Sequence, residues 1–475
     1  MKGAVLLILL TSLALGENAG IKTRITQNAL DFFTDAKQIL PMLPEMPEFA
    51  DSTEISVLGK IDYKVYDIKI TSLKHSPKTF LTVKPGVGLY WHGGVIYVAV
   101  EAKWIYDTHS IIPISDSGKV EVKITVSSTP FDLKVAADES GHLKIDIADK
   151  HCHYHVEESD IEISGGKEWL YNLIEDKIEE MLKKVANEQI CDLSSNAIRK
   201  DLASALSTVE VIIPLIPDVM SLDLSLIANP ASTESFLDIL HSGEIFDVSS
   251  RSKPSQDKPA FPSDSEDSQM FYIWLTDYGL NSAGQALFSS GYLHYSLTQK
   301  ELPENNTLQL NTSGYEISLL LPQISKSYPN KEIQFKIYPS SPPSVQLTEE
   351  AVELQVQINI ELHIIQDDST TDNVATLQTT LQLAGSLGLE DSRFIWSVSS
   401  FSSQSKLLEA DVEDLDMDII NSALSFASHA FIKQYIKDKG SEGIPLPELG
   451  NGLEIVHPSI EHGEGFVKIG IDLAR

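Results

Sequence analysis

The sequence predicts an α+β fold in which two similar units follow one another along the chain. Three observations support this prediction: stretches where apolar and polar residues alternate, two long helical patterns, and a proline-rich polar segment between the halves. Each half is expected to contain a helix, a set of strands and a second, longer helix. A length of 475 residues also favours more than one hydrophobic core.

In the first half, a helical pattern covers residues 25–40, with Thr26 as a possible cap and Pro41 just after its end. From residue 55 to 163 the period changes to two, as in half-exposed antiparallel strands. From residue 168 to 190, apolar residues recur at i, i+3, i+4 and i+7, which is typical of a long helix with one buried face. Residues 209–226 return to strand-like alternation.

A polar segment with three prolines, residues 251–268, is expected to be a linker. The second half then repeats the plan of the first. Its expected elements are a helix over 278–290, strands over 332–338 and 351–365, a long helix over 417–437 and a last strand over 465–473. The predicted organisation is a signal peptide (1–16), an N-terminal unit (17–230), a central strand with the linker (231–268) and a C-terminal unit (269–475).

The N-terminus has the pattern of a secretory signal peptide. Lys2 precedes an apolar run that ends at the small residues around Gly16, and the run is shorter than a bilayer span. Secretion would make two sequons usable for glycosylation, at Asn305 and Asn311. We therefore expect a secreted, extracellular glycoprotein.

Cys152 and Cys191 are the two cysteines of the chain. In an oxidising compartment they most simply form one disulfide bond, and two free thiols or a metal pair are the alternatives. His151, His153 and His155 alternate along the same expected strand, so their side chains share one face and could hold Zn²⁺. Three surface histidines beside an acidic run are the simpler interpretation, because no fourth ligand is evident, so no metal site is predicted.

The formal net charge of −32 argues against nucleic acid as a partner and against nonspecific attraction to anionic membranes. Six lysines between residues 60 and 84 form the most basic stretch, which could be a solvated face or a contact for an anionic headgroup. We find no G-x-S-x-G, P-loop, H-E-x-x-H or G-x-G-x-x-G motif in a suitable context, so the sequence predicts no enzyme.

Six segments in the right order resemble the family of the bactericidal/permeability-increasing protein, the lipopolysaccharide-binding protein and the plasma phospholipid and cholesteryl ester transfer proteins. The resemblance covers essentially the whole mature chain and is nearest to the bactericidal and lipopolysaccharide-binding branch. It is carried by residues 20–30, 189–191, 224–231, 270–284, 443–447 and 465–473.

The resemblance implies two tandem antiparallel β-barrels, each wrapped around a long helix and joined by a central sheet in an elongated boomerang. It also implies a disulfide between Cys152 and Cys191, and an apolar pocket for phospholipid acyl chains in each barrel. By helical phase, the pocket candidates are Leu30, Phe33, Leu40, Leu173, Ile178 and Leu182 in the first barrel, and Leu287, Ile420, Leu424 and Phe431 in the second. For any one of them, simple packing against the sheet is the alternative.

In the bactericidal branch, the tip of the first barrel carries a cluster of Lys and Arg, whereas the corresponding stretch here, residues 102–109, has one lysine. The remaining candidates for contact with anionic lipid are Lys74, Lys78, Lys84, Lys103 and Trp104. The leading expectation is a monomeric, peripheral lipid-binding protein that holds phospholipid, needs no other cofactor, and meets lipopolysaccharide or the bacterial outer membrane. A lipid transfer or carrier protein without bactericidal activity is the alternative, and a foam-forming surfactant secretion is a third.

Overall fold

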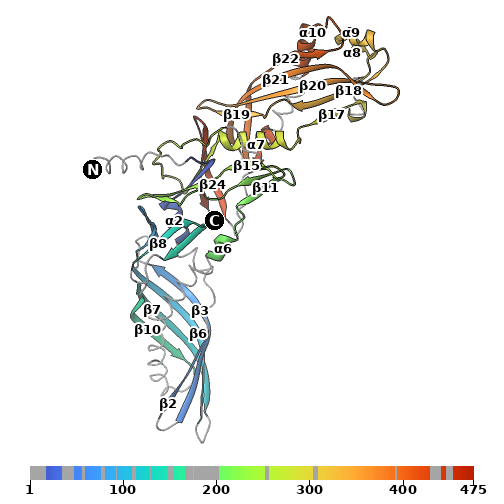
Figure 1. Cartoon of the computed structure of the whole chain (residues 1–475). Helices are drawn as coiled ribbons and strands as arrows, with labels where there is room; N and C mark the ends of the chain where they lie inside the picture. The colour runs from blue at the N-terminus through green and yellow to red at the C-terminus, as the bar shows by residue number, and fades with distance from the viewer. Residues whose placement is uncertain are drawn as a thin grey trace, which may run out of the picture.

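The computed structural model describes residues 18–34, 48–55, 59–75, 81–92, 94–109, 114–128, 130–147, 154–165, 175, 203–251, 256–302, 309–390, 393–427, 440–445 and 453–474. In these ranges strands predominate, and the molecule is elongated and bent, with one sheet at each end and another between them (Figure 1). The antiparallel sheets and the elongated, bent shape implied by the family resemblance are therefore confirmed, and the described ranges are mostly β rather than α+β. Closure of each sheet around a long helix stays a prediction, because most of residues 166–202 and 428–439 lies outside the described ranges.

The N-terminal half contains two antiparallel sheets. The larger one has long strands that run to the far end of the molecule (Figure 1), and its order is β10 (Tyr154–Ser164), β7 (Ser115–Ser128), β6 (Gly94–Thr108), β3 (Gly59–His75) and β2 (Phe49–Ile55). The smaller one has the order β4 (Leu81–Lys84), β5 (Gly88–Trp91), β8 (Phe131–Ala137) and β9 (Leu143–Ile147). The alternation predicted over residues 55–163 forms these strands.

A central sheet joins the two halves. Its order is β13 (Ala231–Ser232), β14 (Phe236–His241), β1 (Ile21–Thr26), β16 (Phe271–Thr276), β25 (Phe466–Ala474) and β24 (Glu454–Gly463). Strands β1 and β16 are antiparallel neighbours, and Thr23 lies opposite Ile273. Each of them leads into a helix, β1 into α2 (Gln27–Thr34) and β16 into α7 (Asp277–Ser289), so the two halves begin in the same way.

This arrangement corrects the first predicted helix, which was expected from residue 25. Ile25 belongs to β1, where it pairs with Leu237 on one side and Phe271 on the other, and the helix begins two residues later at Gln27. Pairing with a strand on each side satisfies the backbone of residues 21–26 and overrides the local helical pattern.

The C-terminal half is built on a sheet with the order β17 (Tyr295–Leu297), β18 (Glu332–Pro339), β20 (Val352–Ile365), β21 (Thr371–Glu390), β22 (Arg393–Ala410) and β23 (Ile444–Pro445), with β19 (Ser344–Leu347) paired to β20. At its outer end lie the helices α8 (Tyr315–Leu320), α9 (Pro322–Ser327) and α10 (Met417–Ala427) (Figure 1). The expected helices over 278–290 and 417–437 correspond to α7 and, within the described range, to α10.

Further short elements connect these parts. They are α6 (Ala203–Ser207), the 3₁₀ helix η5 (Gln299–Glu301), and a small sheet of β11 (Ile212–Ile216), β12 (Met220–Asp223) and β15 (Glu244–Asp247). The described part of the proline-rich segment contains an isolated bridge, Ala260 with Asn18, but no helix or longer strand. It crosses the central sheet, and the carbonyls of Asp264 and Glu266 accept hydrogen bonds from the Arg24 guanidinium.

Candidate functional site

An apolar cavity of about 180 Å³ lies at the outer end of the C-terminal sheet, beneath α8, α9 and α10. Every lining side chain is aliphatic or aromatic, and the residues come from these helices, from β18, β20 and β21, and from Leu415 and Leu321 beside the helices. For comparison, an apolar cavity of roughly 150 Å³ in a protein core stays dry and takes up small apolar molecules. This cavity therefore suits a length of hydrocarbon chain.

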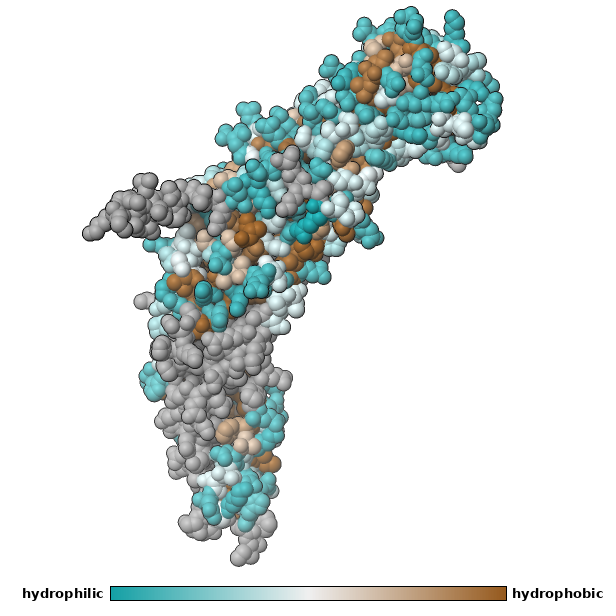
Figure 2. All heavy atoms as spheres, in the orientation of Figure 1, coloured by the Kyte–Doolittle hydropathy of each residue, from teal (hydrophilic) through white to brown (hydrophobic). Residues whose placement is uncertain are grey.

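Two local features of the sequence place α10 over the cavity. The carboxylate of Asp416 accepts hydrogen bonds from the backbone N–H groups of Asp418 (3.0 Å) and Ile419 (3.1 Å), and this caps the helix. Ile420, Ala423 and Leu424 then recur at i, i+3 and i+4 and point into the cavity. Figure 2 shows apolar surface at this end of the molecule, where α8 and α10 also carry the exposed Leu319 and Ile419.

The pocket candidates of the second barrel have different outcomes. Ile420 and Leu424 both line the cavity. Leu287 does not line it, because its helix α7 packs against β15 and β19 at the inner end of the sheet, away from the cavity helices (Figure 1). Phe431 lies outside the described residues.

In the first barrel, Leu30 packs against the core cluster that contains Val83, Leu89 and Leu237. Phe33 is 42% exposed, and its ring contacts those of Phe32 and Phe271 edge to face. Neither Leu30 nor Phe33 lines any of the cavities found among the described residues. Leu40, Leu173, Ile178 and Leu182 lie outside the described residues.

Trp104 was expected to contact a lipid surface, and the structure corrects this expectation. Its side chain is 2% exposed, stacks on Tyr106 with ring centroids 5.9 Å apart, and donates a hydrogen bond to the carbonyl of Lys119. The indole lies against Gly118, where a Cβ atom would come within 2.8 Å of the ring. Trp104 is thus part of an inward-facing core with Val65 and Val120.

Two of the four candidate lysines of the N-terminal half are paired with carboxylates. Lys103 lies 2.8 Å from Asp67, which also pairs with Lys69, and these hydrogen bonds lower the pKa of Asp67. Lys84 lies 2.5 Å from Asp132 and over the ring of Tyr90. Lys74 is exposed on β3 without a carboxylate partner in the described part of the chain, and Lys78 lies outside it.

The remaining candidates are mostly beyond the described ranges. Cys152, Cys191, His151, His153 and Asn305 lie outside them, and no group of three His, Cys, Asp or Glu within them could hold a metal ion. His155 is exposed on β10. Asn311 is half-buried, and its Oδ1 accepts a hydrogen bond from the N–H of Ser313.

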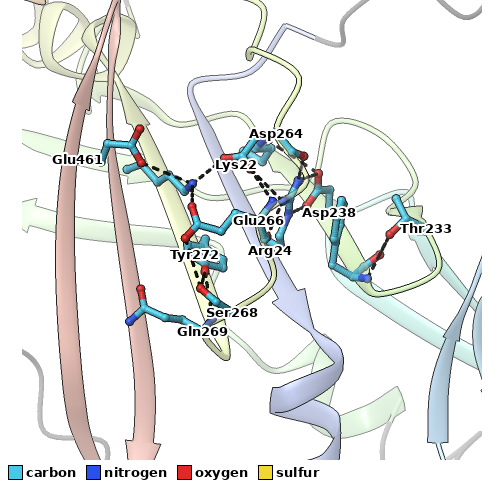
Figure 3. A network of polar contacts seen from close by, with 12 residues as sticks. Lys22, Arg24, Thr233, Asp238, Asp264, Glu266, Ser268, Gln269, Tyr272 and Glu461 are labelled. Carbon is cyan, nitrogen blue, oxygen red and sulfur yellow. Dashed lines mark hydrogen bonds and ion pairs between the residues drawn. The ribbon is translucent and has the colours of Figure 1, made fainter. Parts of the chain in front are cut away.

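Sequence reasoning did not identify a cluster of buried cations on the central sheet (Figure 3). Arg24 is 1% exposed, makes a two-point hydrogen bond to Asp238 (2.7 and 2.9 Å) and stacks on Phe236 at 3.4 Å. Lys468 lies 2.6 Å from Asp264 and 2.5 Å from Glu266, both in the proline-rich segment. The clue in the sequence was the placement of two charged residues, Lys22 and Arg24, at alternate positions of the first strand, on one face.

The pKa values of the two buried lysines differ because their partners differ. Burial lowers the pKa of Lys22 to about 8, and its ammonium lies 3.7 Å above the Trp274 ring. Burial would also lower the pKa of Lys468, but its hydrogen bonds to Asp264 and Glu266 raise it overall. The proline-rich segment is therefore held to the sheet by charge-assisted hydrogen bonds to the buried Lys468 ammonium, and such bonds fix the geometry of their partners.

Comparisons with known proteins agree with this architecture. Residues 39–202 match the N-terminal domain of the LBP/BPI/CETP family, and residues 215–474 match its C-terminal domain. The lipopolysaccharide-binding protein of Bos taurus is 25% identical over 473 residues, covering 98% of this chain and 96% of its own. The protein of the same name from Mus musculus is 27% identical, covering 91% and 89%.

The bactericidal permeability-increasing protein of Sebastes schlegelii is 22% identical and covers 98% of both chains. Among solved structures, the crystal structure of lipopolysaccharide binding protein is 24% identical, covers 96% of this chain and 99% of its own, and superposes with a TM-score of 0.54. No helix in the described ranges is long and apolar enough to span a membrane. The chain belongs to the LBP/BPI/CETP family, whose members are non-enzymatic lipid-binding proteins.

Proposed function

We propose that this protein is a secreted lipid carrier that holds a phospholipid acyl chain in the cavity beneath α10. The observation that carries the proposal is the composition of that cavity, because all of its lining is apolar and Ile420 and Leu424 reach it from one helix face. Each methylene moved from water into such a lining contributes roughly 0.8 kcal/mol. The acyl chain of the lipid, rather than its headgroup, would supply most of the binding affinity.

The charge distribution supports a zwitterionic or neutral lipid over a strongly anionic one. Lysines 60, 64, 69, 84 and 103 each lie beside a carboxylate, and the whole chain carries a formal charge of −32. A phosphate-rich headgroup would have to compete with these carboxylates for each lysine. Phosphatidylcholine is therefore the lipid to test first.

Lipopolysaccharide binding is the second candidate, and it is supported by the similarity to the lipopolysaccharide-binding proteins of Bos taurus and Mus musculus. In this chain it would depend on the basic stretch around Lys74. Such binding should weaken as salt rises, because exposed charges are screened within roughly 10 Å at 0.1 M. Acyl-chain binding should change little over the same range.

The test is binding of phosphatidylcholine with a fluorescent acyl chain to the purified protein, together with native mass spectrometry of lipid that co-purifies. Ala423→Trp should block the cavity and abolish the fluorescence change, whereas Ser422→Trp, one residue away on the exposed face of α10, should not. Thermal unfolding of both variants checks that they fold. Equal binding by both variants, or a protein free of lipid that takes up none, would refute the proposal.

A further inference from the structure

A second, polar groove of about 840 Å³ lies between α7 and the β19–β22 part of the C-terminal sheet. It shares no lining residue with the apolar cavity. Its size falls in the range of roughly 300–1,000 Å³ that is usual for small-ligand sites. The two elements that border it, α7 and β19, lie side by side at the inner end of the sheet (Figure 1).

Uncharged polar side chains of four neighbouring strands line one wall of the groove. Ser344, Gln355, Gln382 and Ser402 lie directly opposite one another in register across β19, β20, β21 and β22. The Gln382 amide donates to Gln355 Oε1, and the Ser402 hydroxyl donates to Gln382 Oε1, both at 3.4 Å. These long, weak bonds can be exchanged for bonds to a ligand.

The opposite wall is held in place by α7. The Asn281 amide donates to the carbonyl of Val345 (2.8 Å) and accepts from its N–H (2.7 Å). Gln256 accepts from the Asn281 amide (2.9 Å) and donates to Asp277 (3.1 Å). Contacts among α7, β19 and Gln256 of the proline-rich segment therefore fix the position of the Asn281 and Gln256 amides before a ligand arrives.

The chemistry of the lining selects a class of ligand. The lining contains two carboxylates, Asp277 and Glu353, and no Lys, Arg or His among the described residues, so it offers phosphate, sulfate or carboxylate groups no counter-ion. Amides donate and accept, as do hydroxyls, and this matches the hydroxyl groups of a sugar. Pro342 and Pro343 provide apolar surface for the C–H faces of a sugar ring, whereas Leu383 and Phe401 are buried in a core cluster behind the polar wall.

We propose that this groove binds an uncharged oligosaccharide, with Gln355 and Gln382 on one wall and Gln285 on the other as hydrogen-bonding residues. This site is independent of acyl-chain binding, because the two sites share no residue. The protein could hold a lipid and a neutral glycan at the same time.

The test is saturation-transfer difference NMR of the full-length protein with maltoheptaose, mannotetraose and chitotetraose as neutral probes, and with sialyllactose as an anionic probe. At least one neutral probe should bind. Gln382→Leu and Gln285→Leu should each weaken that binding by roughly five- to tenfold, the effect of one or two lost hydrogen bonds.

Gln404→Leu is the matched control, because Gln404 is exposed on the same face of β22, two residues from Ser402, yet outside the groove. It should bind the probe as the unmodified protein does. The proposal is overturned if no neutral probe binds, if sialyllactose alone binds, or if all three variants bind equally well.

Discussion

Thr26 and Thr276 make equivalent hydrogen bonds, each to the chain segment that precedes the other's strand. The Thr26 hydroxyl donates to the carbonyls of Gln269 (2.7 Å) and Met270 (3.1 Å), and the Thr276 hydroxyl donates to the carbonyl of Gly20 (2.6 Å). Both residues end a central strand and precede a helix, and both are almost fully buried. The two halves of the chain therefore meet at a junction with local twofold symmetry.

We predict that Thr26→Val and Thr276→Val each lower the free energy of unfolding by roughly 0.5–1.5 kcal/mol, because valine has a similar shape but loses the hydroxyl's hydrogen bonds, while the backbone N–H groups of residues 26 and 276 still donate to the carbonyls of Met270 and Gly20. The measurement is urea unfolding followed by tryptophan fluorescence. Thr71→Val is the control, since Thr71 is exposed and donates to Ala99 at 3.3 Å. An effect no larger than that of Thr71→Val would show that the junction hydroxyls are dispensable.

A second prediction concerns the ion pair of Arg24 and Asp238. Asp238→Asn should destabilise the protein by roughly 3–5 kcal/mol, because the buried guanidinium loses the charge of its two-point partner and keeps only the longer ion pair with Asp264 at 3.6 Å. The double variant Arg24→Met/Asp238→Leu should recover much of that loss, since it removes both charges. Asp160→Asn, which breaks an exposed pair with Lys123, should change stability by less than about 1 kcal/mol. A similar loss in Asp238→Asn and Asp160→Asn would contradict the prediction.

The lowered pKa of Lys22 predicts a pH dependence of stability. Its pKa is about 8 in the folded protein and about 10.5 when the chain is unfolded, so between these values the unfolded state binds more protons. The contribution of Lys22 to stability is therefore constant below about pH 8 and rises as pH increases towards 10.5.

The measurement compares the denaturant midpoints of the native protein and Lys22→Met at pH 7, 9 and 10. The difference between them should shift in favour of the native protein as pH rises. Lys468→Met should not show this rise, because the pKa of Lys468 is raised and its ammonium stays charged over this range. A constant difference between the native protein and Lys22→Met would mean that Lys22 does not titrate there.

Strand periodicity predicted much of this fold from the sequence, since it reports which side chains share a face. Residues 354–364 alternate strictly and form the middle of β20, and the helical phase that groups Ile420 with Leu424 agrees with their position in the lining of the apolar cavity. The short helices α8 and α9 were not predicted, because each spans six residues and α9 starts afresh at Pro322. A pattern of that length is too short to establish a helical period.

Alternation does not reveal which face of a strand is buried when both faces carry aromatic or charged residues. The burial of Lys22 and Arg24 depends on the carboxylates of Asp238 and Asp264, more than two hundred positions away. Likewise, Leu287 has a helical phase compatible with a pocket, but its helix packs on β15 and β19. Such long-range pairings are not visible in a local pattern.

The last prediction tests the corrected position of Trp104. Along β6, Ala102, Trp104 and Tyr106 are buried, and the intervening residues are exposed. Trp104→Ala should therefore lower the free energy of unfolding by roughly 3–5 kcal/mol, as expected for a large buried aromatic residue. Ile105→Ala, at the neighbouring position on the outer face, should have a much smaller effect on stability.

Urea unfolding measures the stability of both variants, and vesicle binding can be measured on the same samples. A surface-inserting Trp104 would give the opposite pattern, with unchanged stability and weaker vesicle binding, because its indole would then contact lipid rather than Tyr106 and Gly118.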